Sequence, residues 1–117
     1  MSNQSLIVTT LTNFTVNNVV IPVEFLHYEG HGEPYITFMR ESNDGSFAGD
    51  DDLLGYIEYY DFDVYAKGNY LSIVDQLKTT LKTAGFVFQP SRSSEDMYES
   101  DTGYYHITLN FAIPKEE

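Results

Sequence analysis

The sequence contains no cysteine, and only six of its 117 residues are lysine or arginine. Without cysteine the chain forms no disulfide, offers no thiolate to a metal and has no cysteine nucleophile. The few cations face 18 acidic residues, so the formal net charge is −12. A chain this acidic has no basic surface for phosphates or anionic lipids. We therefore expect neither sequence-specific nucleic-acid binding nor membrane adsorption.

Long hydrophobic runs are missing as well. No stretch approaches the ~20 apolar residues of a membrane-spanning helix, and the first residues lack the cationic and apolar segments of a secretory signal. We therefore expect a protein that is made in the cytoplasm. Apolar residues still make up 42% of the chain, which is enough for one packed core in a single domain of residues 1–117.

Hydrophobic periodicity predicts an α+β fold with a mostly antiparallel β-sheet of about four to five strands. Residues 1–18 are expected to form an arm or a short N-terminal helix, residues 19–113 the core, and residues 114–117 a frayed tail. The predicted strands cover residues 19–28, 35–40, 53–67, 86–89 and 104–113, and the first two form a hairpin. Pro22 indicates a sheet edge, because proline donates no ladder hydrogen bond. The acidic segments 41–52 and 91–102 are expected to be loops.

One long helix is predicted over residues 69–85, packed on one face of the sheet. Asn69 suits the N-cap, and Gly85 suits the C-terminal stop. The apolar stripe of this helix consists of Leu71, Val74, Leu77, Leu81 and Ala84.

The stretch 53–67 predicts an unusually long, half-buried strand, with Tyr60 and Phe62 on one face and Asp61 and Asp63 on the other. At ~3.3 Å per residue, such a strand is longer than the roughly 35 Å diameter expected of a compact domain of this size. One end must then overhang and needs a partner, either a hairpin arm or another subunit.

Three groups of polar residues could carry chemistry, and each has a simpler interpretation. The first group alternates as metal ligands could and consists of His27, Glu29, His31 and Glu33. The second group could bind Ca²⁺ or Mg²⁺ and consists of Asp50, Asp51 and Asp52. The third is a possible carboxylate pair with split pKa values, Asp61 and Asp63. Glycines interrupt the first group, and the EF-hand spacing is absent from the second. Ordinary solvent exposure is the favoured interpretation of all three.

Sequence motifs of catalysis are missing. There is no G-x-S-x-G elbow, no P-loop and no G-x-G-x-x-G fingerprint. We therefore expect no enzymatic activity, no cofactor and no bound metal. Tyrosine is abundant instead, and we expect Tyr59 and Tyr98 at an interface, because tyrosine combines large buried area with a polar tip.

The order of elements is similar to that of a known family. A long strand ends in Asp61-Phe62-Asp63-Val64-Tyr65-Ala66-Lys67-Gly68, and a helix opens at Asn69-Tyr70 and runs through Leu77-Lys78-Thr79-Thr80-Leu81-Lys82-Thr83-Ala84-Gly85-Phe86. An acidic loop, residues 95–106, then leads into the last strand. Over roughly residues 20–113 this pattern resembles the small tail terminator proteins of long-tailed bacteriophages and prophages, also called tail completion, head–tail joining or minor capsid proteins.

The resemblance implies a structural virion protein without catalytic residues. Such proteins form rings, usually hexameric, at the head-proximal end of the tail tube, where they contact the tube and the head connector; some are monomeric until they meet the tail. Strong acidity suits a pore through which DNA slides without sticking. Asp50, Asp51, Asp52, Asp61 and Asp63 are the candidate lumen or interface positions. The short, threonine-rich N-terminal segment departs from the longer helix common in the family.

Two other functions fit parts of the sequence. An acidic DNA mimic, such as an anti-restriction inhibitor that binds a basic host protein, would explain the charge of −12. However, the carboxylates form no regular helical row. A small metal-dependent enzyme using His27 and His31 is the weaker alternative.

Overall fold

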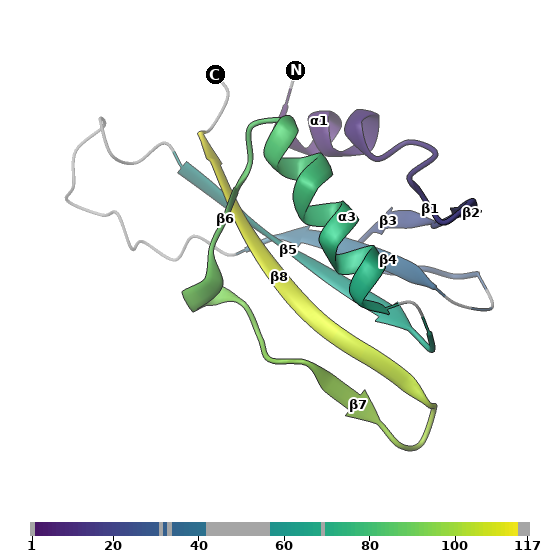
Figure 1. Cartoon of the computed structure of the whole chain (residues 1–117). Helices are drawn as coiled ribbons and strands as arrows, with labels where there is room; N and C mark the ends of the chain where they lie inside the picture. Colours follow the sequence, from purple (N-terminus) through teal and green to yellow (C-terminus); the bar gives the residue numbers. More distant parts are fainter. Residues whose placement is uncertain (1, 31, 33, 42–56, 69, 115–117) are drawn as a thin grey trace.

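A computed structural model describes residues 2–30, 32, 34–41, 57–68 and 70–114. The elements are α1 (Asn3–Thr10), β1 (Thr15–Val16), β2 (Val19–Val20), β3 (Val23–Phe25), β4 (Tyr35–Arg40), β5 (Ile57–Ala66), α3 (Tyr70–Thr83), β6 (Val87–Phe88), the 3-10 helix η1 (Pro90–Arg92), β7 (Met97–Glu99) and β8 (Tyr104–Pro114). In the main sheet the strand order is β3-β4-β5-β8-β6, and β7 also pairs with β8. Helices α1 and α3 lie over the same face of this sheet (Figure 1). The predicted α+β fold is confirmed, although the described sheet has more strands than expected.

The centre of the sheet is the antiparallel pair β5 and β8. Their register runs from Ile57 opposite Pro114 to Ala66 opposite Tyr105. All of β5 therefore has a partner within the same chain, and β4 pairs with its other side. Of the two predicted kinds of partner, the described part of the strand has one from the same chain, because the last strand is long enough to pair with all of it. Residues 53–56 lie outside the described part.

Side chains alternate along β5 as the sequence predicts. Tyr60, Phe62 and Val64 are buried beneath the helices, and the residues between them face the opposite side of the sheet. Phe62 contacts the rings of Phe38 and Phe111 from the neighbouring strands, with centroids 5.8 and 5.5 Å away. Burial of these apolar rings is the main source of stability for the sheet–helix layer.

Helix α3 packs on the sheet through Tyr70, Ile73, Val74, Leu77 and Leu81. Leu71 was expected in this stripe but is 65% exposed. At about 100° per residue it lies at the margin of the stripe, and Tyr70 fills the first turn instead. The helix ends as predicted. Gly85 has a φ of 105°, and the amide of Phe86 donates to the carbonyl of Leu81 at 3.0 Å, as in a Schellman cap.

The predicted hairpin of the first two strands is wrong. The predicted strand 19–28 breaks before Pro22, and β3 then pairs with β4 in parallel. Leu26, with a φ of 71°, ends β3 and turns the chain away before it re-enters as β4. The glycines and the proline between these strands indicate a turn, but they do not show whether β4 runs parallel or antiparallel to β3. Pro22 does precede an edge strand, as expected.

The second acidic segment contains a strand that was expected to be loop. β7 (Met97–Glu99) pairs antiparallel with β8 through Met97 opposite His106 and Glu99 opposite Tyr104. Between β6 and β7, the backbone amide of Ser94 donates to the carbonyl of Thr108 at 2.9 Å. The strands β6 and β7, with Ser94 between them, therefore line the outer edge of β8. The first acidic segment lies beyond Glu41, outside the described residues.

Candidate functional site

The sheet face opposite the helices carries a band of polar side chains from β5 and β8. Register places Asp61 opposite Asn110, Asp63 opposite Thr108, and Tyr65 opposite His106. These residues alternate with the apolar side chains that form the core, so the same periodicity that builds the core also assembles this band.

Asp63 is the centre of one half of the band. His106 Nε2 lies 3.2 Å from Asp63 Oδ1, and the Thr108 hydroxyl donates to the same oxygen. Both ionisable side chains are largely buried, with 23% of Asp63 and 17% of His106 exposed. Burial alone would raise the pKa of Asp63, but the hydrogen bonds from His106 and Thr108 outweigh it and hold this pKa below its ordinary value.

A column of stacked rings runs across the strands beside Asp63. The His106 ring lies on Tyr65 at 4.2 Å, Tyr65 on Tyr35 at 4.7 Å, and Tyr35 on Tyr28 at 4.8 Å. Burial, with the nearby charge of Asp63, raises the pKa of Tyr65 to about 12. Since the rings stack on one another, the column links the strands of the sheet.

Asp61 is the centre of the other half. The Asn110 side-chain amide donates to Asp61 Oδ1 at 2.8 Å and to Glu41 Oε1 at 3.1 Å. Arg92 donates to Glu41 Oε1 at 3.0 Å and places its guanidinium 3.8 Å from the Tyr59 ring centroid. Burial raises the pKa of Asp61, and the charges of Glu41 and Asp63 add to this effect. The network ties η1 to the end of β4 and to the central strands.

The two strand carboxylates differ from the favoured interpretation. Asp61 and Asp63 are partly buried and hydrogen-bonded, so ordinary solvent exposure is wrong for both. Their environments shift the two pKa values in opposite directions, as the carboxylate-pair interpretation expects. An Asp–His pair can exchange a proton, but here the carboxylate accepts bonds from within the chain. The described contacts of the two carboxylates link the central strands to each other.

The other candidate residues lie apart from this band. Tyr98 is 59% exposed on β7, and its ring lies 5.0 Å from that of Tyr105. His27 Nε2 is 3.0 Å from Glu29 Oε2 in an exposed pair. Asp50, Asp51, Asp52, His31 and Glu33 are outside the described residues. Among the residues that the structure describes, no three His, Cys, Asp or Glu side chains are placed to hold a metal ion.

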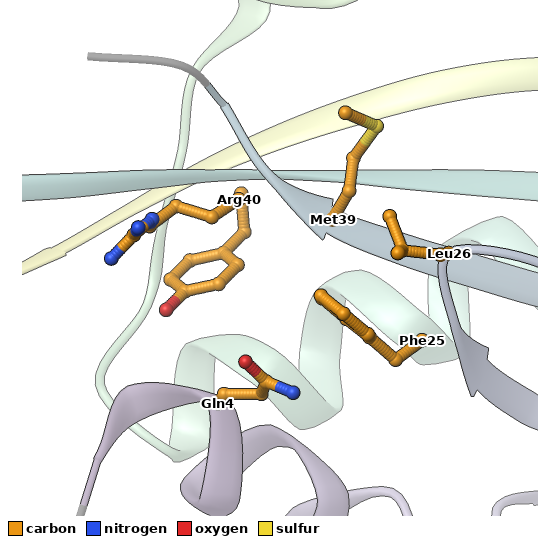
Figure 2. A pocket seen from close by; sticks show the side chains of 6 residues that line it. Gln4, Phe25, Leu26, Met39 and Arg40 are labelled. Carbon is orange, nitrogen blue, oxygen red and sulfur yellow. The ribbon is translucent and has the colours of Figure 1, made fainter.

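Two exposed apolar patches lie at opposite edges of the sheet. The β3 patch surrounds a cavity of about 250 Å³ lined by Gln4, Phe25, Leu26, Met39, Arg40 and Tyr60 (Figure 2). The β7 patch surrounds a larger hollow of about 630 Å³ lined by Lys67, Gly68, Tyr70, Leu71, Ser72, Asp96 and Tyr105. Tyr98 flanks this hollow through its contact with Tyr105. Apolar surface of this kind is typical of interaction sites.

Several residues of these sites were missed by sequence reasoning. Arg92 and Glu41 lie in segments expected to be loops, 51 residues apart in sequence. The polar alternation of His106, Thr108 and Asn110 was visible, but only the strand register shows that it faces Asp61 and Asp63. The exposure of Leu26 follows from a backbone conformation that no sequence pattern announces.

Comparison of the chain with protein-family models gave no match, and neither did comparison with curated proteins. None of the described helices is long and apolar enough to cross a membrane.

Proposed function

We propose that the chain is a structural subunit of a phage or prophage virion, a tail terminator or head–tail joining protein that closes the head-proximal end of the tail tube as a ring. The resemblance over roughly residues 20–113 supports the family. The observation that carries the proposal is the pair of unlike apolar patches on opposite edges of one sheet.

A ring needs such a pair of patches. In a head-to-tail interface each subunit uses two different surfaces, and the ring closes when the rotation between neighbours closes. The β3 patch lies at the edge formed by β3, and the β7 patch lies beside the edge formed by β7, with β4, β5 and β8 between them. A subunit with this layout can contact one neighbour on each side, as a usually hexameric ring requires.

The charge distribution supports a pore for DNA. The chain has 18 acidic residues against six cations. Two of the cations are engaged with carboxylates in the described part, Arg40 with Glu58 at 3.3 Å and Arg92 with Glu41 at 3.0 Å. An assembly of such subunits presents a strongly anionic surface, which repels the phosphate backbone and allows DNA to slide. In this proposal the protein is not an enzyme, and its partners are copies of itself, the tail tube and the head connector.

The test is a tube-growth assay with the tail-tube protein of the same phage or prophage. With the chain present, we expect a cap at one end of each tube and an arrest of further growth. An unrelated acidic protein of similar size is the control for a pure charge effect. Unchanged tube lengths and uncapped ends would contradict the proposal. Salt-sensitive binding to a basic host nuclease, in the same preparation, would favour the acidic inhibitor instead.

A further inference from the structure

The side-chain amide of Asn110 lies between two carboxylates and uses only one of its two polar atoms. Asn110 Nδ2 donates to Asp61 Oδ1 at 2.8 Å and to Glu41 Oε1 at 3.1 Å. Asn110 is fully buried, and among the described residues its Oδ1 is the buried side-chain polar atom that has no hydrogen-bond partner. Buried acceptors are nearly always paired in native proteins, so this oxygen points to a ligand of the amide group.

The strands hold the three side chains in place. Asp61 in β5 lies directly opposite Asn110 in β8. Glu41 follows β4, and its backbone amide donates to the carbonyl of Tyr59 in β5 at 2.8 Å, which continues the pairing of these strands. Side chains that project from paired strands keep their relative positions more precisely than side chains on loops. The two carboxylates and the amide therefore form a defined group on the sheet face opposite the helices.

The charge of this group is negative. Arg92 Nη2 lies 3.0 Å from Glu41 Oε1 and supplies one positive charge against the carboxylates of Glu41 and Asp61. Asp63 adds a further carboxylate two residues along the same face of β5. Burial raises the pKa of Asp61, and the charges of Glu41 and Asp63 add to this effect. A second cation at this place would relieve the repulsion between the carboxylates.

The geometry also suits a cation once the amide is turned over. A half-turn of the Asn110 amide exchanges Nδ2 and Oδ1, and it breaks no hydrogen bond of Oδ1, because Oδ1 has none. The oxygen then occupies the place of Nδ2, which is 2.8 Å from the Asp61 oxygen and 3.1 Å from the Glu41 oxygen. Oxygen ligands that are ~2.4 Å from one Ca²⁺ ion and about 75° apart are roughly 3 Å from each other. Three oxygens with this spacing can bind the same ion.

We propose that a Ca²⁺ ion binds between Asp61 and Glu41, with the turned Asn110 Oδ1 as the third protein ligand. The site needs no third carboxylate, because an amide oxygen takes that position. Water completes the shell on the side where 35% of the Glu41 side chain is exposed. Ca²⁺ is favoured over Mg²⁺, since ligands fixed on strands do not adjust to the strict octahedron of Mg²⁺. With two carboxylates we expect a dissociation constant on the order of 0.1–1 mM.

A calcium titration of the full chain, followed by heteronuclear NMR, tests the site. The protein is first treated with a chelator and kept at constant ionic strength, so that screening of its charge does not change. CaCl₂ should shift the side-chain amide signals of Asn110 and should saturate at one ion per chain. Asp61→Asn should lose this saturable shift while it stays folded, because the substitution keeps an oxygen that can accept from Asn110.

Two further variants separate a specific site from the general acidity of the chain. Asp75→Asn removes the same charge from an exposed position on α3, which lies over the other face of the sheet, and it should bind Ca²⁺ like the unchanged chain. Arg92→Gln removes the cation that competes for Glu41, and it should bind Ca²⁺ several-fold more tightly. An amide with only a structural role would show no such gain.

Three results would overturn the proposal. They are shifts that do not saturate, a saturable shift of Asn110 that persists in Asp61→Asn, and an equal loss of binding in Asp75→Asn. Binding of MgCl₂ as tight as that of CaCl₂ would overturn the choice of ion. The titration uses the isolated chain, so its failure leaves the proposed tail function standing, and uncapped tubes leave the calcium site standing.

Discussion

His106 Nε2 and Asp63 Oδ1 lie 3.2 Å apart across neighbouring strands, whereas Asp61, two residues earlier on the same face, accepts a hydrogen bond from Asn110 and lies near the carboxylate of Glu41. Two identical side chains on one strand are therefore in opposite electrostatic situations. The pKa of Asp63 is lowered and that of Asp61 is raised. This difference leads to a matched pair of substitutions that should differ in their effect on stability.

Asp63→Asn removes a buried charge that His106 and Thr108 stabilise, so we expect a loss of roughly 1–3 kcal/mol in unfolding free energy at neutral pH. Asp61→Asn keeps an oxygen that can accept from Asn110 and removes the repulsion from Glu41 and Asp63, so we expect no loss. Urea unfolding of both variants measures the difference. Equal destabilisation by the two substitutions would contradict the assignment.

The same pair predicts the pH dependence of stability. The pKa of Asp63 is lower in the folded chain, so its contribution is complete above the ordinary unfolded value of about 3.9 and is lost as pH falls through the lower folded pKa. The pKa of Asp61 is raised, so ionised Asp61 is unfavourable at neutral pH, and this cost disappears as pH falls through its folded pKa. Unfolding at a series of pH values should show the deficit of Asp63→Asn shrinking in acid. A constant deficit would oppose this account.

Two leucines of α3 separate packing from surface exposure. Leu77 is fully buried, so Leu77→Ala should cost about 2–5 kcal/mol through lost burial and a cavity. Leu71 is largely exposed, so Leu71→Ala should change stability by less than about 0.5 kcal/mol. Thermal or urea unfolding compares them in the same helix. Similar losses would mean that the face of α3 assigned to the core is wrong.

Gly85 tests the end of the helix. Its φ of 105° is unfavourable for any residue with a side chain, and a Cβ added there meets no atom within 4 Å. The cost of Gly85→Ala is therefore one of backbone conformation, about 1–2 kcal/mol. Gly68→Ala is the control, since it also meets nothing and has no positive φ. A neutral Gly85→Ala would contradict the Schellman cap.

Leu26→Gly separates folding from assembly. Glycine removes the strain at a φ of 71°, worth roughly 1–3 kcal/mol, which offsets the larger entropy of the unfolded glycine chain, about 0.4–1 kcal/mol. We therefore expect unchanged or higher subunit stability together with loss of tube capping. Unfolding measurements and the tube-growth assay give the two readouts. Full capping by a stable Leu26→Gly variant would show that the side chain has no part in assembly.

Much of the fold follows from periodicity and local signals. The alternation through Tyr60, Phe62 and Val64 predicts which face of β5 is buried, and Gly85 predicts where α3 ends. The stripe of α3 was displaced at one position, Leu71, because a bulky neighbour took the first turn. Whether a residue at the margin of an apolar stripe is buried depends on tertiary packing and not on helical spacing alone.

Non-local pairing could not be predicted. Nothing in the sequence shows that β3 and β4 are parallel, because the positive φ of Leu26 sets the direction of the chain. The three-residue strand β7 lies in an acidic segment and owes its place to the free edge of β8. For the polar band, the spacing predicts that Asp61 and Asp63 share a face. Their partners Asn110 and His106 could not be predicted, because these contacts depend on the register between β5 and β8.

The measurement that tests the central claim most directly is electron microscopy of tail tubes incubated with the gold-labelled chain. The account predicts label at one end of each tube only, with end views that show a closed ring of subunits. Tubes without label, or label spread along their sides, would contradict the assignment of this chain as the subunit that closes the tail.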